Sequence, residues 1–323
     1  MSLADENGSE ATINITHLLN DSIRQGAKVT DSHLKILDMN IVIEDSKTFV
    51  HCYRLPIDGN GRVRYKPLAE YLRDRIIDYS IPRKRIEEAA NSFRQTGSTA
   101  QFVKLENEAK ALFTSLSQSG EGGELLLFAF AEAVFGLSQI ICKMSLKTSS
   151  QMHYHGADGV YAEGADDGSL KLYWGESKLY GDPSTAVRDC LGSLAPFLVE
   201  PDGEDSAHAR DFFLINEFAN FSNPQLIEGL KRYFNLDDPK SLGLKHCGIA
   251  LIGFDSDQYL EDGFNNDELH LDAQLKLQIP AWVKQIKNRV GKEKIDKYNI
   301  HFICVPMRAV EEFRSYFLGL LGK

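Results

Sequence analysis

The chain has 323 residues, and 43% of them are hydrophobic, which is enough for a sizeable core in one large domain or two ordinary ones. Acidic residues outnumber basic residues by 46 to 36, for a formal net charge of −10. This balance argues against a protein that grips nucleic acid alone, because neutralising phosphates needs a basic surface.

Targeting signals and cysteines indicate the compartment. The chain begins with the acidic, polar segment MSLADENGSE rather than a signal peptide, and it contains no long apolar run. Its five cysteines are scattered and form no C-x-x-C pair, which indicates reduced thiols. We therefore expect a cytoplasmic protein without a membrane segment.

Residues 1–118 are expected to form an N-terminal α+β region, which is a candidate surface for a protein partner. Two runs alternate between apolar and polar residues, the period of a strand, and three later runs have apolar residues at helical spacing. The predicted strands are 34–43 and 48–55, and the predicted helices are 67–79, 82–93 and 102–116. The Ser/Gly-rich stretch at 117–123 indicates the boundary with a second domain at 119–323.

The stretch at 123–137 is apolar in nearly every direction around a helix, so it predicts a buried helix. It is too short to cross a bilayer, which needs about 20 apolar residues. The helix carries Glu124 in its first turn and Glu132 further on, and we expect Glu132 at the edge of the core. Strands are predicted at 143–149, 155–162 and 170–180, with turn residues at 164–169.

The C-terminal part of the chain alternates between helices and apolar strands. Short apolar runs at 247–254 and 299–305 are typical of strands buried on both faces. The run at 269–279 has the alternation of a strand but the composition of a helix, and we predict a helix there. The other predicted helices are 184–194, opened by Asp182 and Pro183, then 207–218, 225–234, 281–290 and 309–321.

Two acidic residues are expected to face each other across the hairpin formed by the predicted strands 155–162 and 170–180. Opposite residues in an antiparallel pair have a constant index sum, so a turn about Asp167 places Asp158 opposite Glu176. Their Cβ atoms would lie roughly 4.5 to 5.5 Å apart, and two like charges at that distance destabilise a sheet unless a cation lies between them. A divalent metal ion is one such cation.

Further oxygen and nitrogen groups complete this candidate site. Lys178 shares the face of Glu176, and the backbone carbonyl of Ser177 lies between them. Glu124 of the apolar helix is a further candidate, although an acid in a first turn is also favoured by the helix dipole. Hard oxygen ligands suit Mg²⁺, and a metal-bound water beside a lysine suits phosphodiester hydrolysis.

At these residues the chain resembles the PD-(D/E)XK nuclease superfamily, in which an Asp is followed by an acid two residues before a Lys. The matching residues are Asp158, Glu176 and Lys178, with Glu124 as the helix acid, while Ala157 replaces the usual Pro. The resemblance implies an α/β fold with a PD-(D/E)XK restriction-endonuclease-like core, which is a central mixed sheet flanked by helices.

More narrowly, the chain is similar to the HamA family, the nuclease subunits of the Hachiman anti-phage defence system. The similarity covers 120–194, in the segments GELLLFAFAEAVFG, KMSLKTS, HGADGVY and GESKLYGDPSTAVRDCL. It implies a DNA endonuclease dependent on Mg²⁺ or Mn²⁺ that acts with a helicase subunit, HamB-like, during infection. Asp158, Glu176 and the Ser177 carbonyl would bind the metal, Glu124 would assist, and Lys178 would orient water or stabilise the transition state.

Two other functions stay open. The acidic balance fits a non-catalytic, nuclease-like scaffold that regulates a helicase. A nuclease directed at RNA shares the same chemistry, because the pattern encodes the metal site and not the groove for the substrate. The sequence has no G-x-x-x-x-G-K-[ST] motif, so any ATP-driven unwinding falls to a partner.

Some polar residues near the predicted hairpin are further candidates for a functional role. His153 and His155 share a predicted strand face, but they lack the second pair of a structural zinc site. Arg188 is a surface charge by default and a candidate contact for a phosphate. The basic residues expected to gather near the site are Lys143, Lys147, Lys171, Lys178 and Arg188.

Overall fold

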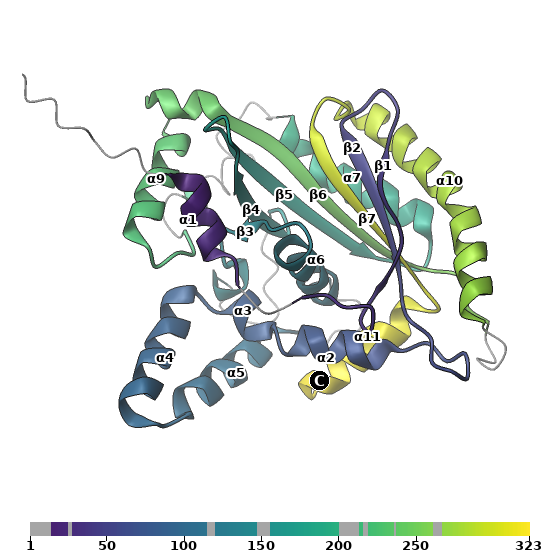
Figure 1. Cartoon of the computed structure of the whole chain (residues 1–323), viewed down its shortest axis with the longest axis horizontal. Coiled ribbons are helices and arrows are strands. Elements are labelled where there is room, and N and C mark those ends of the chain that lie inside the picture. The colour runs from purple at the N-terminus through teal and green to yellow at the C-terminus, as the bar shows by residue number, and fades with distance from the viewer. Residues whose placement is uncertain are drawn as a thin grey trace, which may run out of the picture.

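The computed structural model describes residues 14–24, 28–114, 120–146, 156–199, 213–215, 219–235, 237–260 and 267–323. Within these residues lies one mixed sheet of seven strands in the order β1-β2-β7-β6-β5-β4-β3 (Figure 1). The inner strands β2, β7, β6 and β5 are parallel, and β1, β4 and β3 add antiparallel pairs at the edges. The strands are β1 (Lys35–Val42), β2 (Thr48–Arg54), β3 (Ser138–Gln139), β4 (Gly159–Gly164), β5 (Leu170–Leu179), β6 (Leu244–Asp255) and β7 (Asn299–Met307).

The inner strands are apolar because helices cover both faces of the sheet. Successive side chains of a strand point to opposite faces. In β6, Ile249, Ala250, Leu251 and Ile252 are all completely buried, so neither face reaches solvent. The prediction of doubly buried strands at 247–254 and 299–305 is therefore confirmed.

The two faces are covered by different helices. Gly175 of β5 faces α6 (Glu121–Ala133), because a Cβ on it would lie 3.0 Å from Leu127. Trp174 faces the other way and stacks on Phe197 of α7 (Pro183–Leu198) with ring centroids 5.2 Å apart. The remaining described helices are α1 (Ile15–Ser22), α2 (Tyr65–Arg73), α3 (Ile76–Ser80), α4 (Arg83–Thr96), α5 (Ala100–Leu112), α9 (Pro224–Phe234), α10 (Glu268–Glu293) and α11 (Val310–Leu321), with the 3₁₀-helices η1 (Lys143–Leu146) and η2 (Pro239–Gly243).

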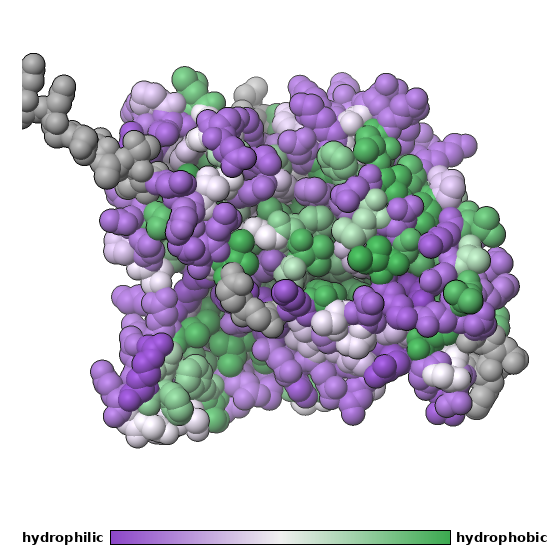
Figure 2. All heavy atoms as spheres, in the orientation of Figure 1, coloured by the Kyte–Doolittle hydropathy of each residue, from purple (hydrophilic) through white to green (hydrophobic). Residues whose placement is uncertain are grey.

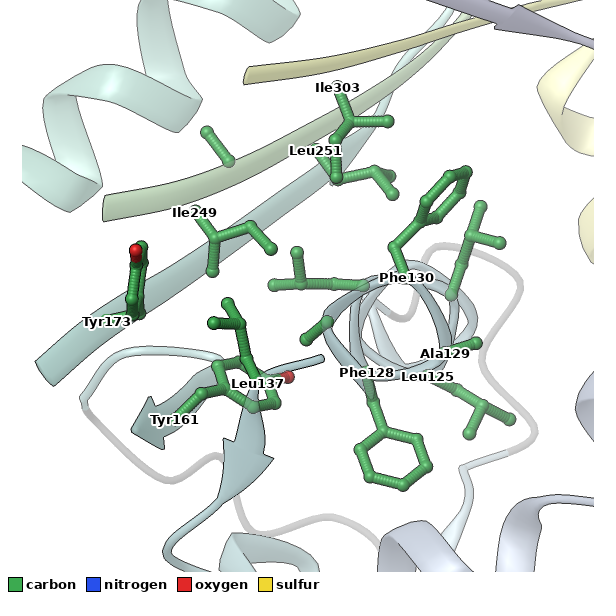
Figure 3. Packing of buried hydrophobic residues seen from close by; sticks show 14 of the residues in the cluster. Leu125, Phe128, Ala129, Phe130, Leu137, Tyr161, Tyr173, Ile249, Leu251 and Ile303 are labelled. Carbon is green, nitrogen blue, oxygen red and sulfur yellow. The ribbon is translucent and has the colours of Figure 1, made fainter. Parts of the chain in front are cut away.

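The helix α6 is the apolar helix expected at the centre of the molecule. Figure 3 shows it nearly end on, with side chains such as Phe128 and Phe130 leaving it in different directions. Ile249 and Leu251 of β6 lie on the side of the sheet that faces this helix. The prediction of an all-round buried helix is confirmed.

Glu132 lies in the interior, and the prediction that it sits at the edge of the core is wrong. Its side chain is only 1% exposed. Three arginine side chains reach its carboxylate at 2.7, 3.1 and 3.4 Å, from Arg24, Arg75 and Arg83 respectively. A buried charge is tolerated when it is paired in this way, and the partners come from segments that a local sequence pattern does not connect.

Two predicted elements differ in the structure. The strand expected at 143–149 is wrong, because residues Lys143–Leu146 form the 3₁₀-helix η1 and 147–149 lie outside the described residues. Local hydrogen bonds explain this, since the Ser145 amide and hydroxyl both donate to the Cys142 carbonyl, at 3.2 and 2.7 Å. The single helix expected at 67–79 is divided into α2 and α3.

Other predictions agree with the structure or fall outside it. The helix predicted at 269–279 is confirmed, and it continues through Pro280 as the single long helix α10. Most of the helix expected at 207–218 lies outside the described residues. The strands β1 and β2 join β7, so residue 118 marks no break in the sheet, and a partner-binding role for 1–118 stays a prediction.

The surface is mostly hydrophilic on the face shown in Figure 2, with hydrophobic residues gathered over the middle of the molecule. Exposed apolar side chains on the edge strand β1 include Ile36 and Val42. No helix in the described parts of the chain is both long enough and apolar enough to cross a membrane.

Candidate active site

The candidate site begins at the hairpin of β4 and β5. Gly159 pairs with Gly175 in an antiparallel register, and the Asp158 amide donates to the Gly175 carbonyl at 2.8 Å. The antiparallel pairing ends at Gly159 and Gly175, one residue before Asp158 and Glu176. The register predicted from the constant index sum is confirmed over 159–164 and 170–175, and the opposition of Asp158 and Glu176 stays a prediction.

Asp158 is held in place by the residue after Glu176. The amide and the hydroxyl of Ser177 both donate to Asp158 Oδ2, each at 2.8 Å. The N–H and C=O of one strand residue point toward the same neighbouring strand, so the Ser177 carbonyl also points to the Asp158 side. One acid and one backbone carbonyl thus meet where β4 begins.

Glu176 and Lys178 form a buried ion pair on the opposite face of β5 from Ser177. Lys178 Nζ donates to Glu176 Oε2 at 3.1 Å, and the lysine and glutamate side chains are 21% and 4% exposed. Burial, followed by the charge of Asp158, raises the pKa of Glu176 well above its usual value. Burial would lower the pKa of Lys178, but the charges of Asp158 and Glu176 outweigh it and raise that pKa, so Lys178 remains a cation.

The helix α7 closes this face of the site. Cys190 Sγ donates to the Glu176 carbonyl at 3.4 Å, and its thiol is fully buried. Burial raises the pKa of Cys190 well above its usual value, with a further contribution from the charge of Glu176. Cys190 therefore stays a neutral thiol and packs the site rather than reacting.

Glu124 lies at the other side of the sheet, on α6. The Tyr79 hydroxyl donates to Glu124 Oε2 at 2.8 Å. Burial, then the charge of Glu124 and more weakly that of Asp158, raise the pKa of Tyr79, so both acids lie near this phenol. The start of α6 also touches the site, because a Cβ on Gly123 would lie 3.2 Å from Ser177 Oγ.

Two further residues lie at the site: Lys143, whose predicted place near the site is confirmed although its predicted strand is not, and Tyr79, which the sequence did not single out. Lys143 is buried, and its Nζ donates to the Ala157 carbonyl at 2.6 Å, directly before Asp158. Its positive charge also acts to lower the pKa of Glu176. Tyr79 comes from α3, far along the chain, and no local pattern singles it out.

The expected gathering of basic residues is only partly found. The prediction that Lys171 lies near the site is wrong. The register places Lys171 opposite Glu163, near the hairpin turn and at the other end of β5 from Lys178. It forms an ion pair with Glu163 at 3.0 Å. Arg188 is exposed and pairs with Asp189 at 2.8 Å, and Lys147, His153 and His155 lie outside the described residues.

The donor set fits a hard divalent cation. Asp158 and Glu176 offer carboxylate oxygens and Ser177 offers a carbonyl, and Mg²⁺ is commonly held by one or two carboxylates with water in the other positions. Among the described residues no group of three or more His, Cys, Asp or Glu side chains lies close enough to hold a metal ion. The fit is therefore to a water-rich Mg²⁺ or Mn²⁺ site and not to a cage of protein side chains.

A mixed α/β sheet in which neighbouring residues hold two carboxylates beside a half-buried lysine is a nuclease-like arrangement. A family model for HamA matches residues 31–320. The chain therefore belongs to the HamA family, whose members are proteins of anti-phage defence in the Hachiman system. The family predicted from the segment 120–194 is confirmed over most of the chain. No curated protein matches the chain in sequence.

Proposed function

We propose that the chain is a metal-dependent DNA endonuclease of the PD-(D/E)XK type. The observation that carries the proposal is that neighbouring residues of β5 hold both acids: Ser177 donates to Asp158 at 2.8 Å, and Lys178 donates to Glu176 at 3.1 Å. A carboxylate as buried as Glu176 with a second acid nearby is costly in an ordinary sheet, and a bound cation removes that cost.

Each residue has a distinct part in this proposal. Asp158, Glu176 and the Ser177 carbonyl would hold Mg²⁺ or Mn²⁺, with Glu124 as an assisting acid. The ion supplies an activated water and offsets charge on the phosphate. Ser177 orients Asp158 through its amide and hydroxyl. Lys178, a cation, stabilises the charge that builds on the non-bridging oxygens.

The proposed setting is phage defence beside a helicase subunit. The sequence contains no nucleotide-binding G-x-x-x-x-G-K-[ST] motif, so unwinding of DNA would be the partner's work. A helicase partner that makes most of the contacts with DNA also accounts for the net charge of −10, because the chain itself then needs less basic surface.

The test is cleavage of supercoiled plasmid by the full chain with Mg²⁺ and with EDTA. We expect nicking or degradation that requires the metal and that Lys178→Ala abolishes. Lys171→Ala is the matched control, since it removes a lysine from the same strand that also pairs with a glutamate. If Lys178→Ala cleaves as well as the Lys171→Ala control, the site assignment is wrong.

The net charge favours one competing function, a non-catalytic scaffold that regulates a helicase. It predicts no metal-dependent cleavage of DNA by the chain even when its helicase partner is added. Parallel assays with single-stranded RNA separate a ribonuclease from a deoxyribonuclease. If the chain cleaved RNA but not DNA, the proposed substrate would be RNA, and the proposed roles of the residues would be unchanged.

A further inference from the structure

A groove lies between α7 and α10 on the face of the sheet opposite α6. Its volume is about 250 Å³, and Ser184 and Arg188 of α7 line it together with Asn288, Arg289 and Lys292 of α10. The two helices lie on the same face, because Phe254 of β6 packs edge to face against Trp282 of α10, with ring centroids 5.0 Å apart, and the even-numbered residues of β6 share the face of Trp174.

The part of the chain that supplies one wall of this groove is basic, although the whole chain is acidic. The segment 283–297 contains six basic residues and two acidic ones, which gives a formal charge of +4 in a chain whose net charge is −10. The basic residues are Lys284, Lys287, Arg289, Lys292, Lys294 and Lys297, and the acidic ones are Glu293 and Asp296. Of these cations, Arg289 and Lys292 line the groove itself.

The cations that line the groove differ in how they are held. Arg289 forms an ion pair with Glu293 at 2.5 Å, and its Nη2 would lie 3.0 Å from a Cβ on Gly192, so the guanidinium rests on the backbone of α7. Its Nε is buried and has no hydrogen-bond partner within the described structure. In the described part of the chain, neither Lys284, one turn before Asn288, nor Lys292 takes part in an ion pair.

The groove and the candidate active site share the helix α7. Ser184 and Arg188 of α7 line the groove, and Cys190, two residues beyond Arg188, donates to the Glu176 carbonyl at 3.4 Å. A strand of nucleic acid that lies in the groove would therefore run along the helix that packs against Glu176.

We propose that this groove binds the phosphodiester backbone of the nucleic-acid strand that the candidate site cleaves. The proposal rests on the proposed nuclease function and adds the surface that holds the substrate. Phosphates are recognised by arginine forks and by lysine point charges, and Ser and Asn add neutral hydrogen bonds to phosphate oxygens. Such contacts position the strand without reading its sequence.

The test is binding of the full chain, in EDTA, to fluorescent single-stranded DNA, duplex DNA and single-stranded RNA across a salt series. The groove variant carries Arg188→Gln, Lys284→Gln and Lys292→Gln. The control variant carries Lys66→Gln, Lys231→Gln and Lys287→Gln, which removes the same charge from α2, α9 and another side of α10, where Lys287 pairs with Glu44. Thermal unfolding of both variants checks that they fold.

We expect the groove variant to bind roughly tenfold more weakly or worse, with a salt slope smaller by about one for each phosphate that the removed cations would neutralise. The control should stay within about twofold of the wild type. Equal affinity and equal salt slope of the groove variant and the wild type would overturn the proposal, and so would a wild-type chain that binds none of the three probes.

Failure of the groove and failure of the nuclease give different results. Lys178→Ala should bind the probes like the wild type and should not cleave plasmid. If the groove variant binds weakly while the wild type shows no metal-dependent cleavage even when its helicase partner is added, the surface stands and the nuclease assignment falls. If cleavage occurs but the groove variant binds like the wild type, the groove assignment alone falls.

Discussion

The two ends of β5 carry the same kind of ion pair in different surroundings. At one end Lys171 pairs with Glu163 at 3.0 Å, and these side chains are 28% and 37% exposed. At the other end Lys178 pairs with Glu176 at 3.1 Å, and these are 21% and 4% exposed. The distances are alike, so the difference lies in burial and in Asp158, which is held by Ser177 next to Glu176. A second carboxylate in a buried place makes a candidate metal site out of an ordinary pair.

The largest difference between the two ends should appear in catalysis. Glu176→Ala removes a proposed metal ligand, and we expect plasmid cleavage in Mg²⁺ to fall by at least about 100-fold. Glu163→Ala removes an acid from the solvated pair, and cleavage should stay within about twofold of the wild type. If both variants lost cleavage to a comparable extent, the loss would reflect disturbed folding rather than removal of a metal ligand.

A second difference should appear in how metal affects stability. A ligand that binds only the folded state raises the melting temperature, so Mg²⁺ should stabilise the wild type and Glu163→Gln. Glu176→Gln should lose that response. In EDTA the same variant should melt about 2 °C higher than the wild type, because burial and the charge of Asp158 disfavour the charged form of Glu176 and so raise its pKa. An undiminished Mg²⁺ response of Glu176→Gln in calorimetry would exclude Glu176 as a ligand.

A smaller effect is expected at Ser177, which orients Asp158. Ser177→Ala removes the hydroxyl donor to Asp158 Oδ2 but keeps the amide donor. One hydrogen bond to a charged group is worth about 2 kcal/mol, so we expect cleavage to fall roughly tenfold to thirtyfold. Ser177→Thr should recover part of the rate only if the hydroxyl itself is needed. Unchanged rates in Ser177→Ala would show that the amide suffices.

The smallest effect is expected on stability at the solvated end of β5. Lys171→Ala breaks a partly exposed pair, and exposed pairs contribute about 0 to 1 kcal/mol to stability. Urea unfolding of this variant should therefore give a free energy within about 1 kcal/mol of the wild type. A much larger loss in the free energy of unfolding would mean that Lys171 stabilises the fold more than a partly exposed ion pair can.

Local patterns in the sequence predict the parts of this molecule that depend on local rules. The hairpin register follows from periodicity and a turn, and the structure has it, while the opposition of Asp158 and Glu176 stays a prediction. The 3₁₀-helix at Lys143–Leu146 was not predictable from alternation, because hydrogen bonds to the Cys142 carbonyl and the contact of Lys143 with Ala157 decide it.

Contacts between distant segments were not predictable from these patterns. In the sequence, Glu132 is one acid in an apolar helix, which suggests a place at the edge of the core. Only the folded chain brings Arg24, Arg75 and Arg83 to it. Tyr79 reaches Glu124 from α3 in the same way. The groove between α7 and α10 is also nonlocal, although the basic run at 283–297 is visible in the sequence.

The position of β7 in the sheet has a consequence for synthesis of the protein. β7 lies between β6 and β2, so it is the strand that joins the hairpin of β1 and β2 to the rest of the sheet. Because β7 is the last described strand to leave the ribosome, β1 and β2 wait with an unpaired edge through most of translation. Late, long-range pairing of this kind folds slowly and exposes strand edges, so the sheet is completed only after β7 has been synthesised.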